Sequence, residues 1–497
     1  MDVLMEFSTN FPFFCILITI AGGVVCSVLR PTAAYRLNLA IATICFVMSG
    51  LLLYTMYIEP RQITFMMGHF SAPWGNEIRF GPFEALMATV FSLVVILSSL
   101  AEKPQIFNKI HQSKTNLFYL MMCLLLASTY ALVYTNDLFT AYVFIEINTL
   151  CSCGFVAAKN SRKAIAATIK YLIMSLLGSG LFLISISLLY ILTGHLLMPN
   201  VQESVETMLS TSGYSLPLTI IVGLMAVSMA IKSALYPFHN WVPVAYNRAF
   251  NLSNALSSGL VLKGYIILLI KIFYRVLGLE IVKELEILNI LLLFGLLSMV
   301  LASIDATRET NIKKMLACSS VAQVGYVYVA IGIGTPLSFA AAAYLIIGHS
   351  MAKSMLYTAC EGLMQSSDNT KFITLIKGSA LRNPFAGLAF TLGGLSMIGF
   401  PLLAGFFGKY LLVLAAIEGS PFLWVILLAL IASTVLNAMY FLRCIVIIYT
   451  KGPTPETTYT APKSFKLSMT LFIVANLALG LGYSVVYQLI EQGLLLL

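Results

Sequence analysis

The sequence predicts an all-α protein that crosses a membrane many times. Its mean hydropathy is +0.92. Of its residues, 59% are hydrophobic and only 10% are charged, whereas soluble proteins average about 25% charged residues. Apolar stretches long enough for a membrane span, which needs about 20 residues, recur along nearly the whole chain. Two of these stretches contain a proline and a lysine, a pattern typical of ion transporters.

We expect about 14 transmembrane helices in a polytopic protein that forms a single transmembrane domain over residues 1–497. No stretch is long and polar enough for a soluble catalytic domain. The first apolar segment lacks a basic start and a small-residue cleavage site, so we expect it to be retained rather than removed as a signal peptide. Four parts are expected: flanking helices over 1–115, a first half over 116–278, a second half over 279–450, and a flanking helix over 451–497.

Two apolar segments, Leu216–Asn247 and Asn383–Ile417, are too long for one straight span of a ~30 Å membrane core. Each has a proline near its middle, Pro237 or Pro401. Proline removes a backbone hydrogen bond and breaks a helix. Broken backbone at membrane depth is tolerated where it is buried in protein or lines a water-filled cavity. We therefore expect broken helices at these two spans.

The two broken helices are the seventh and twelfth predicted spans, which lie five spans apart. This spacing predicts two five-helix repeats, spans 4–8 and spans 9–13. Because five is odd, the second copy must cross the membrane in the inverted orientation. Inverted repeats with discontinuous helices recur in transporters.

The formal net charge of +9 follows a membrane pattern and does not indicate nucleic-acid binding. Basic residues lie mostly in alternate links, such as Arg30 in the first link and Lys163 in the fifth. By the positive-inside rule these links are cytoplasmic, so both termini lie on the non-cytoplasmic side. The link after span 8 is the exception, because it carries Lys271, Arg275 and Lys283.

Glu146 and Lys232 are isolated charges in the apolar segments NDLFTAYVFIEINTLC and AVSMAIKSALYPFHNWVP. A lone charge at the centre of a bilayer costs on the order of 3 kcal/mol, so each is expected to have a partner and a function. We expect a buried ion pair whose two titrations are coupled. A static salt bridge that fixes helix packing is the alternative, although buried pairs are poor stabilisers on their own.

Lys263, in the middle of LSSGLVLKGYIILL, is a second candidate proton carrier. The alternative is a lysine that extends its head group to the membrane interface. His239 follows Pro237 on the broken helix and is placed to pass protons from Lys232 towards Lys263. An ordinary core histidine is the alternative there.

The second half contains three further candidates. His349 and Lys353 are four residues apart and therefore share one face of a helix. They are expected to link the two halves, with a structural role as the alternative. Lys409 lies eight residues after Pro401 and is the candidate exit residue. A lysine at a helix end that reaches the interface is the alternative.

The nine cysteines lie almost entirely in apolar segments, without zinc or iron–sulfur spacing. We expect them to be core residues, and we expect no bound metal and no cofactor in this chain. Asp305 lies near the end of a predicted span and is expected to be a capping or surface residue.

Six segments together carry a resemblance to a known family. They are NDLFTAYVFIEINTL, IKYLIMSLLGSGLFLISISLLYILTG, IKSALYPFHNWVP, IKKMLACSSVAQVGYVYVAIGIGT, GHSMAKSMLY and LSMIGFPLLAGFFGKY. The chain resembles the antiporter-like subunits shared by respiratory complex I, Mrp-type sodium/proton antiporters and energy-converting membrane-bound hydrogenases. The resemblance covers roughly residues 80–450, and the segments are specific only as a set.

The resemblance implies a hydrated axis of charged residues within the membrane. On matching positions, it implies that Glu146 and Lys232 form the ion pair of the first half-channel. It also implies that Lys263 links the halves and that Lys409 is the terminal proton-exchanging lysine. The chain departs from the family after span 7, where WVPVAYNRAFNLSNA lacks the usual acidic residue, second histidine and proline-rich turn. We therefore do not expect the family's full set of groups for proton uptake at that turn.

Two functions follow from these observations. The first is a proton-translocating, antiporter-like subunit of a redox-driven complex, either a membrane-bound hydrogenase or a complex I-like NADH or ferredoxin oxidoreductase. The second is the D-type subunit of an Mrp Na+/H+ antiporter without a redox partner. A stand-alone transporter of an organic solute is a third, weaker hypothesis. The lysine at position 409 matches the hydrogenase, Mrp D-type and complex I N-type patterns better than the M-type pattern, which has glutamate.

We expect the chain to be a non-redox subunit of a translocase in the prokaryotic cytoplasmic (inner) membrane. Its expected partners are homologous antiporter-like subunits, small membrane subunits and a peripheral redox module, with lipid around them. The transported ion is expected to be the proton, and passage of Na+ through this subunit is left open.

Overall fold

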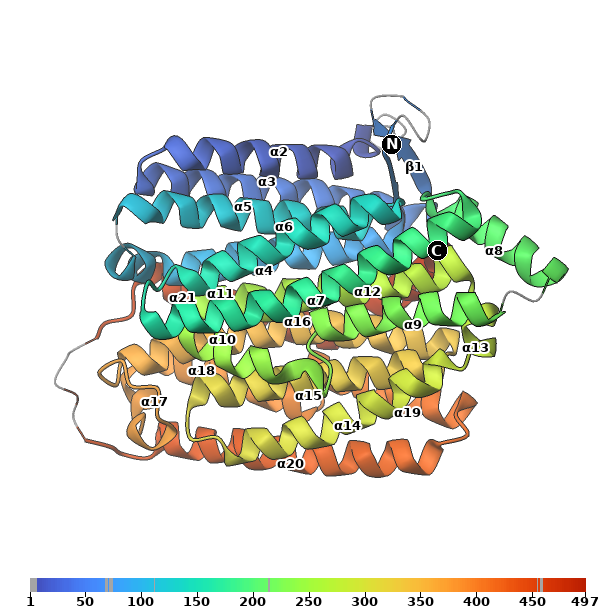
Figure 1. Cartoon of the computed structure of the whole chain (residues 1–497). Helices are drawn as coiled ribbons and strands as arrows, with labels where there is room; N and C mark the ends of the chain where they lie inside the picture. Colours follow the sequence, from blue (N-terminus) through green and yellow to red (C-terminus); the bar gives the residue numbers. More distant parts are fainter. Residues whose placement is uncertain are drawn as a thin grey trace.

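The computed structural model describes residues 7–67, 70, 75–110, 112–212, 215–453, 455 and 459–497. Most helices lie side by side in one bundle, with a two-stranded hairpin at one end (Figure 1). In chain order the elements are α2 (Phe11–Val28), α3 (Pro31–Ile58), β1 (Ile63–Met66), β2 (Glu77–Phe80), α4 (Pro82–Lys109), α5 (Gln112–Tyr134), α6 (Leu138–Ala157), α7 (Arg162–Thr193), α8 (Met198–Ser212), α9 (Ser215–Lys232), η2 (Phe238–Asn240), α10 (Trp241–Arg248), α11 (Asn251–Leu256), η3 (Ser257–Val261), α12 (Leu262–Ile272), η4 (Phe273–Leu277), α13 (Leu279–Glu284), α14 (Ile287–Arg308), α15 (Ile312–Ile333), α16 (Pro336–Gln365), η5 (Ile373–Leu375), α17 (Ser379–Arg382), α18 (Pro384–Ile398), α19 (Ala404–Gly419), α20 (Leu423–Tyr449), α21 (Lys463–Leu481) and α22 (Tyr483–Leu495).

Within the described part of the chain, 11 helices are long and apolar enough to cross a membrane. An all-α polytopic membrane protein is therefore confirmed. The predicted spans 7, 8 and 12 correspond to shorter consecutive pieces, namely α9 with α10, α11 through η4, and α18 with α19. The total of 14 spans, the inverted repeats and the division into halves stay predictions.

The first interruption begins where α9 ends, at Lys232. The indole nitrogen of Trp241, the first residue of α10, donates to the carbonyl of Ile231 at 3.4 Å. The ring of Tyr171 on α7 stacks on Trp241 with centroids 4.2 Å apart. The carbonyl of Ile231, at the end of the helix, also accepts from the backbone nitrogen of Ala234 at 3.2 Å, so a side chain from beyond the break adds a second donor.

The second interruption lies between α18, which ends at Ile398, and α19. Gly399 has φ +98°, a left-handed conformation that glycine adopts without steric cost. A Cβ at this position would lie 3.1 Å from Cδ of Lys409. Gly399 therefore allows the turn and leaves room for the lysine beside it.

Helix α16 lies at the centre of the bundle and carries His349 and Lys353. It begins with a capping box, in which Thr335 and Ser338 satisfy each other's backbone N–H groups. It packs against α4, α11, α15, α18, α19, α21 and α22. Its most apolar stretch is completely buried, so charged residues on it face only protein.

The basic links lie together at the end of the bundle opposite the hairpin, which we call the basic end. Lys371 Nζ donates to Asn247 Oδ1 at 3.0 Å, and Arg382 Nη1 donates to the carbonyl of Pro453 at 3.5 Å. Burial and then neighbouring cations lower the pKa of Lys371; these cations are Arg248, Lys159, Lys314 and Lys163. The basic links, which we predicted to share one side of the membrane, do lie at one end of the bundle. That this end faces the cytoplasm stays a prediction.

The other end of the bundle, the hairpin end, carries β1, β2 and the C-terminal helix. The strands are antiparallel, with Ile63 opposite Phe80 and Met66 opposite Glu77. A Cβ at Gly493 on α22 would lie 2.5 Å from the backbone nitrogen of Phe83. The C-terminal helix is therefore closely packed against the start of α4, just beyond β2 (Figure 1).

Helices α14 and α15 pack through glycines, which yields a prediction. A Cβ at Gly325 would lie 2.5 Å from the backbone nitrogen of Met299. Small residues of this kind let membrane helices approach closely. We expect Gly325→Val to lower the midpoint of thermal unfolding in detergent, because overpacking costs about 1–3 kcal/mol or more. Gly50→Val is the matched control, because nothing lies within 4 Å of a Cβ there; equal shifts for both variants would contradict the packing account.

Candidate functional site

Four of the predicted lysines are buried in the bundle, and their ammonium groups bind uncharged oxygens. Their relative exposures are 1%, 0%, 0% and 8% for Lys232, Lys263, Lys353 and Lys409. In the described part of the chain, none of the four forms an ion pair within 4.0 Å. Hydroxyl and carbonyl groups instead replace the water that each ammonium loses on burial.

Lys232 donates from Nζ to the hydroxyl of Thr149 on α6, at 2.7 Å. Its Nζ also lies 5.7 Å from the centre of the Tyr265 ring, within the range of a cation–π interaction. The expected direct ion pair with Glu146 is not formed. Glu146 still acts electrostatically on Lys232, so the carboxylate is near but not in contact.

Glu146 is only partly buried, which explains the missing contact. It lies on α6 one turn before Thr149 and one turn after Val143, whose side chain is 39% exposed. Leu150, four residues further on, is 60% exposed. The carboxylate therefore lies beside the outer face of α6, while the Thr149 hydroxyl occupies the position next to Lys232.

Lys263 lies just after a π-helical segment, η3, and its ammonium group is hydrogen-bonded to that segment. In a π-helix the hydrogen bonds span five residues rather than four, and such segments are frequent at functional sites. Lys263 Nζ donates to the carbonyl of Ser258 within η3, at 2.5 Å. The Ser258 hydroxyl in turn lies 2.9 Å from that of Ser320 on α15. The sequence showed the serines before Lys263 but not this change of helix type.

Lys353 and His349 lie near Lys263, as their expected role as a link requires. Lys353 donates to the carbonyl of Leu316, at 2.9 Å, and to the Ser319 hydroxyl, both on α15. Lys263, His349 and Lys353 are close enough to repel one another when charged. Three titratable groups from α12 and α16 are therefore within electrostatic reach at the centre of the bundle.

Lys409 binds the carbonyl that the second helix break leaves free. Its Nζ donates to the carbonyl of Ile398, the last residue of α18, at 2.8 Å and to the Thr434 hydroxyl at 3.3 Å. It also lies 4.9 Å from the centre of the Tyr326 ring. The break in the helix thus creates the site that holds the lysine.

Helix α20 supplies polar side chains that the sequence analysis missed. Asn437 accepts from the Tyr440 hydroxyl at 2.5 Å and donates to the Tyr326 hydroxyl at 3.3 Å. Tyr326 donates to Ser433 at 2.9 Å and lies 3.5 Å from Thr434, the residue that Lys409 contacts. The signal was the run STVLNAMY in an otherwise apolar span, with polar residues three or four positions apart on one helix face.

A small cavity lies between His349 and Lys409. Its volume is about 10 Å³, which is close to the space that one water molecule requires. Gln323 also lines it. Neither ring nitrogen of His349, nor Nε2 of Gln323, has a hydrogen-bond partner among the described residues. A water molecule here would satisfy these groups and connect the histidine to the lysine.

His239 lines a surface pocket, and its expected role in passing protons from Lys232 towards Lys263 stays a prediction. Its Nε2 is 4.0 Å from Oδ2 of Asp305 on α14, and its ring stacks on Tyr236. The pocket has a volume of about 390 Å³ and is also lined by Lys170 and Glu309. Asp305, expected to be a capping or surface residue, thus pairs with the histidine of the broken span.

All nine cysteines are buried and unbridged. In the part of the chain that the structure describes, no group of three or more His, Cys, Asp or Glu side chains is arranged to hold a metal ion.

Comparison with known proteins relates this arrangement to a family. The family described as NADH:quinone oxidoreductase/Mrp antiporter, TM matches residues 135–436. Over 429 residues, covering 84% of this chain and 83% of the relative, the chain is 29% identical to NADH-quinone oxidoreductase subunit N of Desulforudis audaxviator. Over 458 residues, 91% and 90% of the two chains, it is 23% identical to a Na(+)/H(+) antiporter subunit of Bacillus subtilis.

A solved structure shares the fold along its whole length. A chain of the Mrp complex from Dietzia sp. superposes with a TM-score of 0.88 at 19% sequence identity, covering 99% of this chain and 97% of that one.

The burial of Lys263 yields a prediction about stability. Burying a single charged group costs several kcal/mol even after the protein relaxes around it, and an apolar residue of similar volume avoids this cost. We therefore expect Lys263→Met to raise the midpoint of thermal unfolding of the purified protein. Replacement of a residue that is kept for function at a cost in stability has this effect.

The matched control is Lys283→Met, because Lys283 is 43% exposed and pairs with Glu280 on the surface. Its effect should stay within about 0.5 kcal/mol. A lower unfolding midpoint for Lys263→Met would show that the lysine is a structural donor.

Proposed function

The chain belongs to the NADH:quinone oxidoreductase/Mrp antiporter transmembrane family, and we propose that it is a proton-translocating, antiporter-like subunit of a larger membrane complex. The observation that carries this proposal is the row of buried lysines held by neutral oxygens, from Lys232 through Lys263 and Lys353 to Lys409. A purely structural buried charge is normally paired with an opposite charge.

Neutral ligands suit a group that must gain and lose a proton. A lysine paired with a carboxylate would leave an uncompensated buried charge when it becomes neutral, which is strongly unfavourable. A hydroxyl or carbonyl remains satisfied by water or by the amine itself. Each of these lysines can therefore exchange its proton without leaving an unpaired carboxylate in the bundle.

Electrostatic interactions among the buried titratable groups set the order of the proton transfers. Glu146 lies near Lys232 without contacting it, so a small shift of α6 or α9 would change the proton affinity of Lys232. At the centre, mutual repulsion disfavours simultaneous charging of Lys263, His349 and Lys353. A proton arriving at one of these groups therefore favours release from another, towards the cavity beside Lys409.

Protons enter this axis, in our proposal, from the pocket that contains His239 and Asp305. The pocket lies beside the first helix break, and Asp305 is four residues before Glu309, which follows the last residue of α14 and lines the same pocket. The imidazole of His239 can carry a proton, and its Nε2 lies 4.0 Å from the more exposed carboxylate of Asp305. This pair replaces the groups for proton uptake that the VAYNRAFN turn lacks.

The parent complex has two candidates, a redox-driven pump and an Mrp antiporter. Relatives named as subunits of both kinds match over more than four fifths of this chain, so both assignments are compatible with the sequence. In either case the chain acts beside other membrane subunits in a prokaryotic cytoplasmic membrane, with both termini on the non-cytoplasmic side. The basic end then faces the cytoplasm.

Removing the first lysine tests the proposed function. In the assembled complex reconstituted into liposomes, we expect Lys232→Ala to lower turnover-coupled proton transport or antiport at least about tenfold, because a positioned proton-transfer group typically contributes about 10²–10⁴-fold. The control is Lys283→Ala, an exposed lysine at the hairpin end. Normal transport in a correctly assembled Lys232→Ala complex would contradict the proposal.

Purification of the native complex through a tag on this chain separates the two candidates. We expect a peripheral redox module to copurify and transport to depend on its electron donor. Copurification of membrane antiporter subunits alone, with transport driven by a sodium gradient, would assign the chain to an Mrp antiporter instead.

A further inference from the structure

A second group of buried charges lies at the hairpin end, outside the axis of lysines. Lys271 and Arg275 follow Lys263 on the same helical run and are 0% and 1% exposed. Lys271 is eight residues beyond Lys263, or about 12 Å along a helix. Lys271 and Arg275 are two of the three residues that break the alternation of charge among the links, and burial explains these two. They are not loop residues but part of the bundle.

Arg275 and Glu84 form a fully buried ion pair. Arg275 Nη2 donates to Glu84 Oε1 at 2.6 Å, and both side chains are 1% exposed. The other carboxylate oxygen of Glu84 accepts from the backbone nitrogen of Gly81 at 2.9 Å. Glu84 lies in the first turn of α4, where the helix dipole stabilises a negative charge. The ion pair therefore joins α4 to the second π-helical segment, η4.

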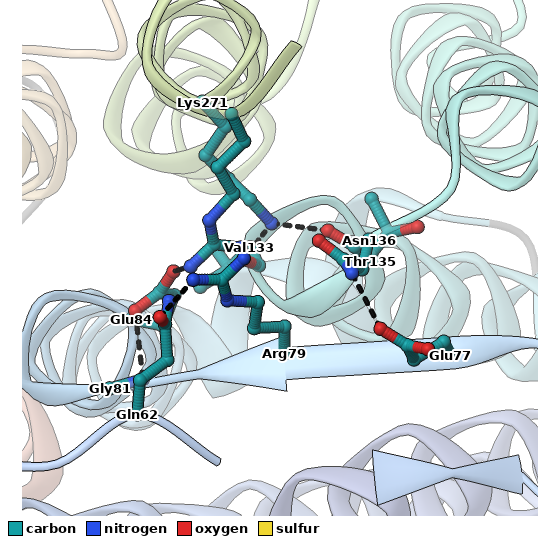
Figure 2. Close-up of polar contacts among 10 residues, drawn as sticks. Gln62, Glu77, Arg79, Gly81, Glu84, Val133, Thr135, Asn136 and Lys271 are labelled. Atoms are coloured by element: carbon teal, nitrogen blue, oxygen red, sulfur yellow. Dashed lines mark hydrogen bonds and ion pairs between the residues drawn. The ribbon is translucent and has the colours of Figure 1, made fainter. Parts of the chain in front are cut away.

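Lys271 is held by the end of another helix. Figure 2 shows its ammonium group directed at the carbonyls of Val133 and Thr135. These carbonyls lie at the C-terminal end of α5, which stabilises a positive charge. Beside them, Asn136 donates to Glu77 at 2.6 Å (Figure 2).

The cluster contains more basic than acidic side chains. Its basic members are Arg79, Lys271 and Arg275 and its acidic members are Glu77 and Glu84, so the fully ionised cluster has three positive and two negative charges. Arg275 also keeps two buried nitrogens, Nε and Nη1, without a hydrogen-bond partner among the described residues. The positive field of the guanidinium is therefore not fully compensated by neighbouring protein groups.

The cluster adjoins a pocket at the surface. The pocket has a volume of about 680 Å³ and is lined by Glu77, Asp137 and His195, among others. Glu77 is shared by the pocket and the cluster. A cation moving inward from this pocket would meet Lys271 and Arg275 before it reached Lys263.

We propose that Arg79, Lys271 and Arg275, with Glu77 and Glu84, form an electrostatic seal that stops cations from passing between the hairpin-end pocket and Lys263. The inference rests on the proposed function, because a seal matters only in a chain that conducts protons. A fixed positive charge lining a path excludes protons and other cations in membrane channels. Arginine suits this role because it does not lose its proton in proteins. An axis open to one side of the membrane must be closed to the other, or the ion gradient would dissipate.

The sign of the charge provides the test. The native complex, without substrate, is reconstituted into liposomes that contain a pH-sensitive dye, and a potassium diffusion potential drives protons inward. We expect Lys271→Met to increase passive proton flux about tenfold, because one charge about 10 Å from the path changes a barrier by roughly that factor. Glu84→Gln removes the ion pair with Arg275 and makes the cluster more positive. We therefore expect no increase in passive proton flux for this variant. Lys271→Arg keeps the positive charge, so its passive proton flux should equal that of the unmodified complex.

Two outcomes would overturn the seal. Equal leakage in Lys271→Met and Glu84→Gln would show structural damage rather than lost repulsion. Normal passive flux in Lys271→Met, together with reduced turnover-coupled transport, would make Lys271 a proton carrier. If Glu84→Gln does not assemble, Arg79→Gln and Glu77→Gln provide a second pair at the edge of the cluster, with leakage expected only for Arg79→Gln. Passive flux is measured without turnover, so its result is independent of the Lys232→Ala experiment.

Discussion

The free-energy cost of burying an ammonium group is the constraint on which the rest of this structure depends. Burial removes most of the water around each lysine head group, so the protein must supply oxygens in its place. Regular membrane helices use their own carbonyls and have none to offer. The fold releases carbonyls where helices break or change type: Ile398 at the second interruption serves Lys409, and Ser258 in a π-helical segment serves Lys263. Irregular backbone and buried charge are thus two aspects of one arrangement.

The kind of partner distinguishes the two groups of buried charge. Along the axis the ammonium groups contact hydroxyls and carbonyls, so a change of protonation state leaves no opposite charge stranded. At the hairpin end a guanidinium faces a carboxylate at 2.6 Å, and each compensates the charge of the other. Lys271 also contacts only carbonyls, but these lie at the C-terminal end of α5, whose dipole stabilises a positive charge, and Lys271 lies in the same cluster as the ion pair. In the function that we propose, protons exchange at the central lysines, and the cluster at the hairpin end closes the path on that side.

The sequence predicted the lysines and the helix breaks, because an isolated charge or a proline in an apolar run has few explanations. Glu146 was also found, but its orientation was not, since the face that a helix residue occupies depends on neighbours that a single sequence does not reveal. Thr149, Asn437 and Tyr440 were missed because uncharged polar residues are common in membrane helices. Glu84 was missed because a carboxylate at a helix start reads as an ordinary capping residue. Its partner Arg275 lies 191 positions away, and such distant pairings follow only from the fold.

A high-resolution structure of the native complex tests the central claim most directly, because it shows whether the buried lysines belong to one hydrated path. We expect ordered water between His349 and Lys409, in the cavity that Gln323 lines, and further water that joins Lys353 to Lys263. We also expect no continuous water from Lys263 past Lys271 to the hairpin-end pocket. Dry apolar packing between His349 and Lys409, with each lysine isolated from the next, would contradict the existence of a shared proton path.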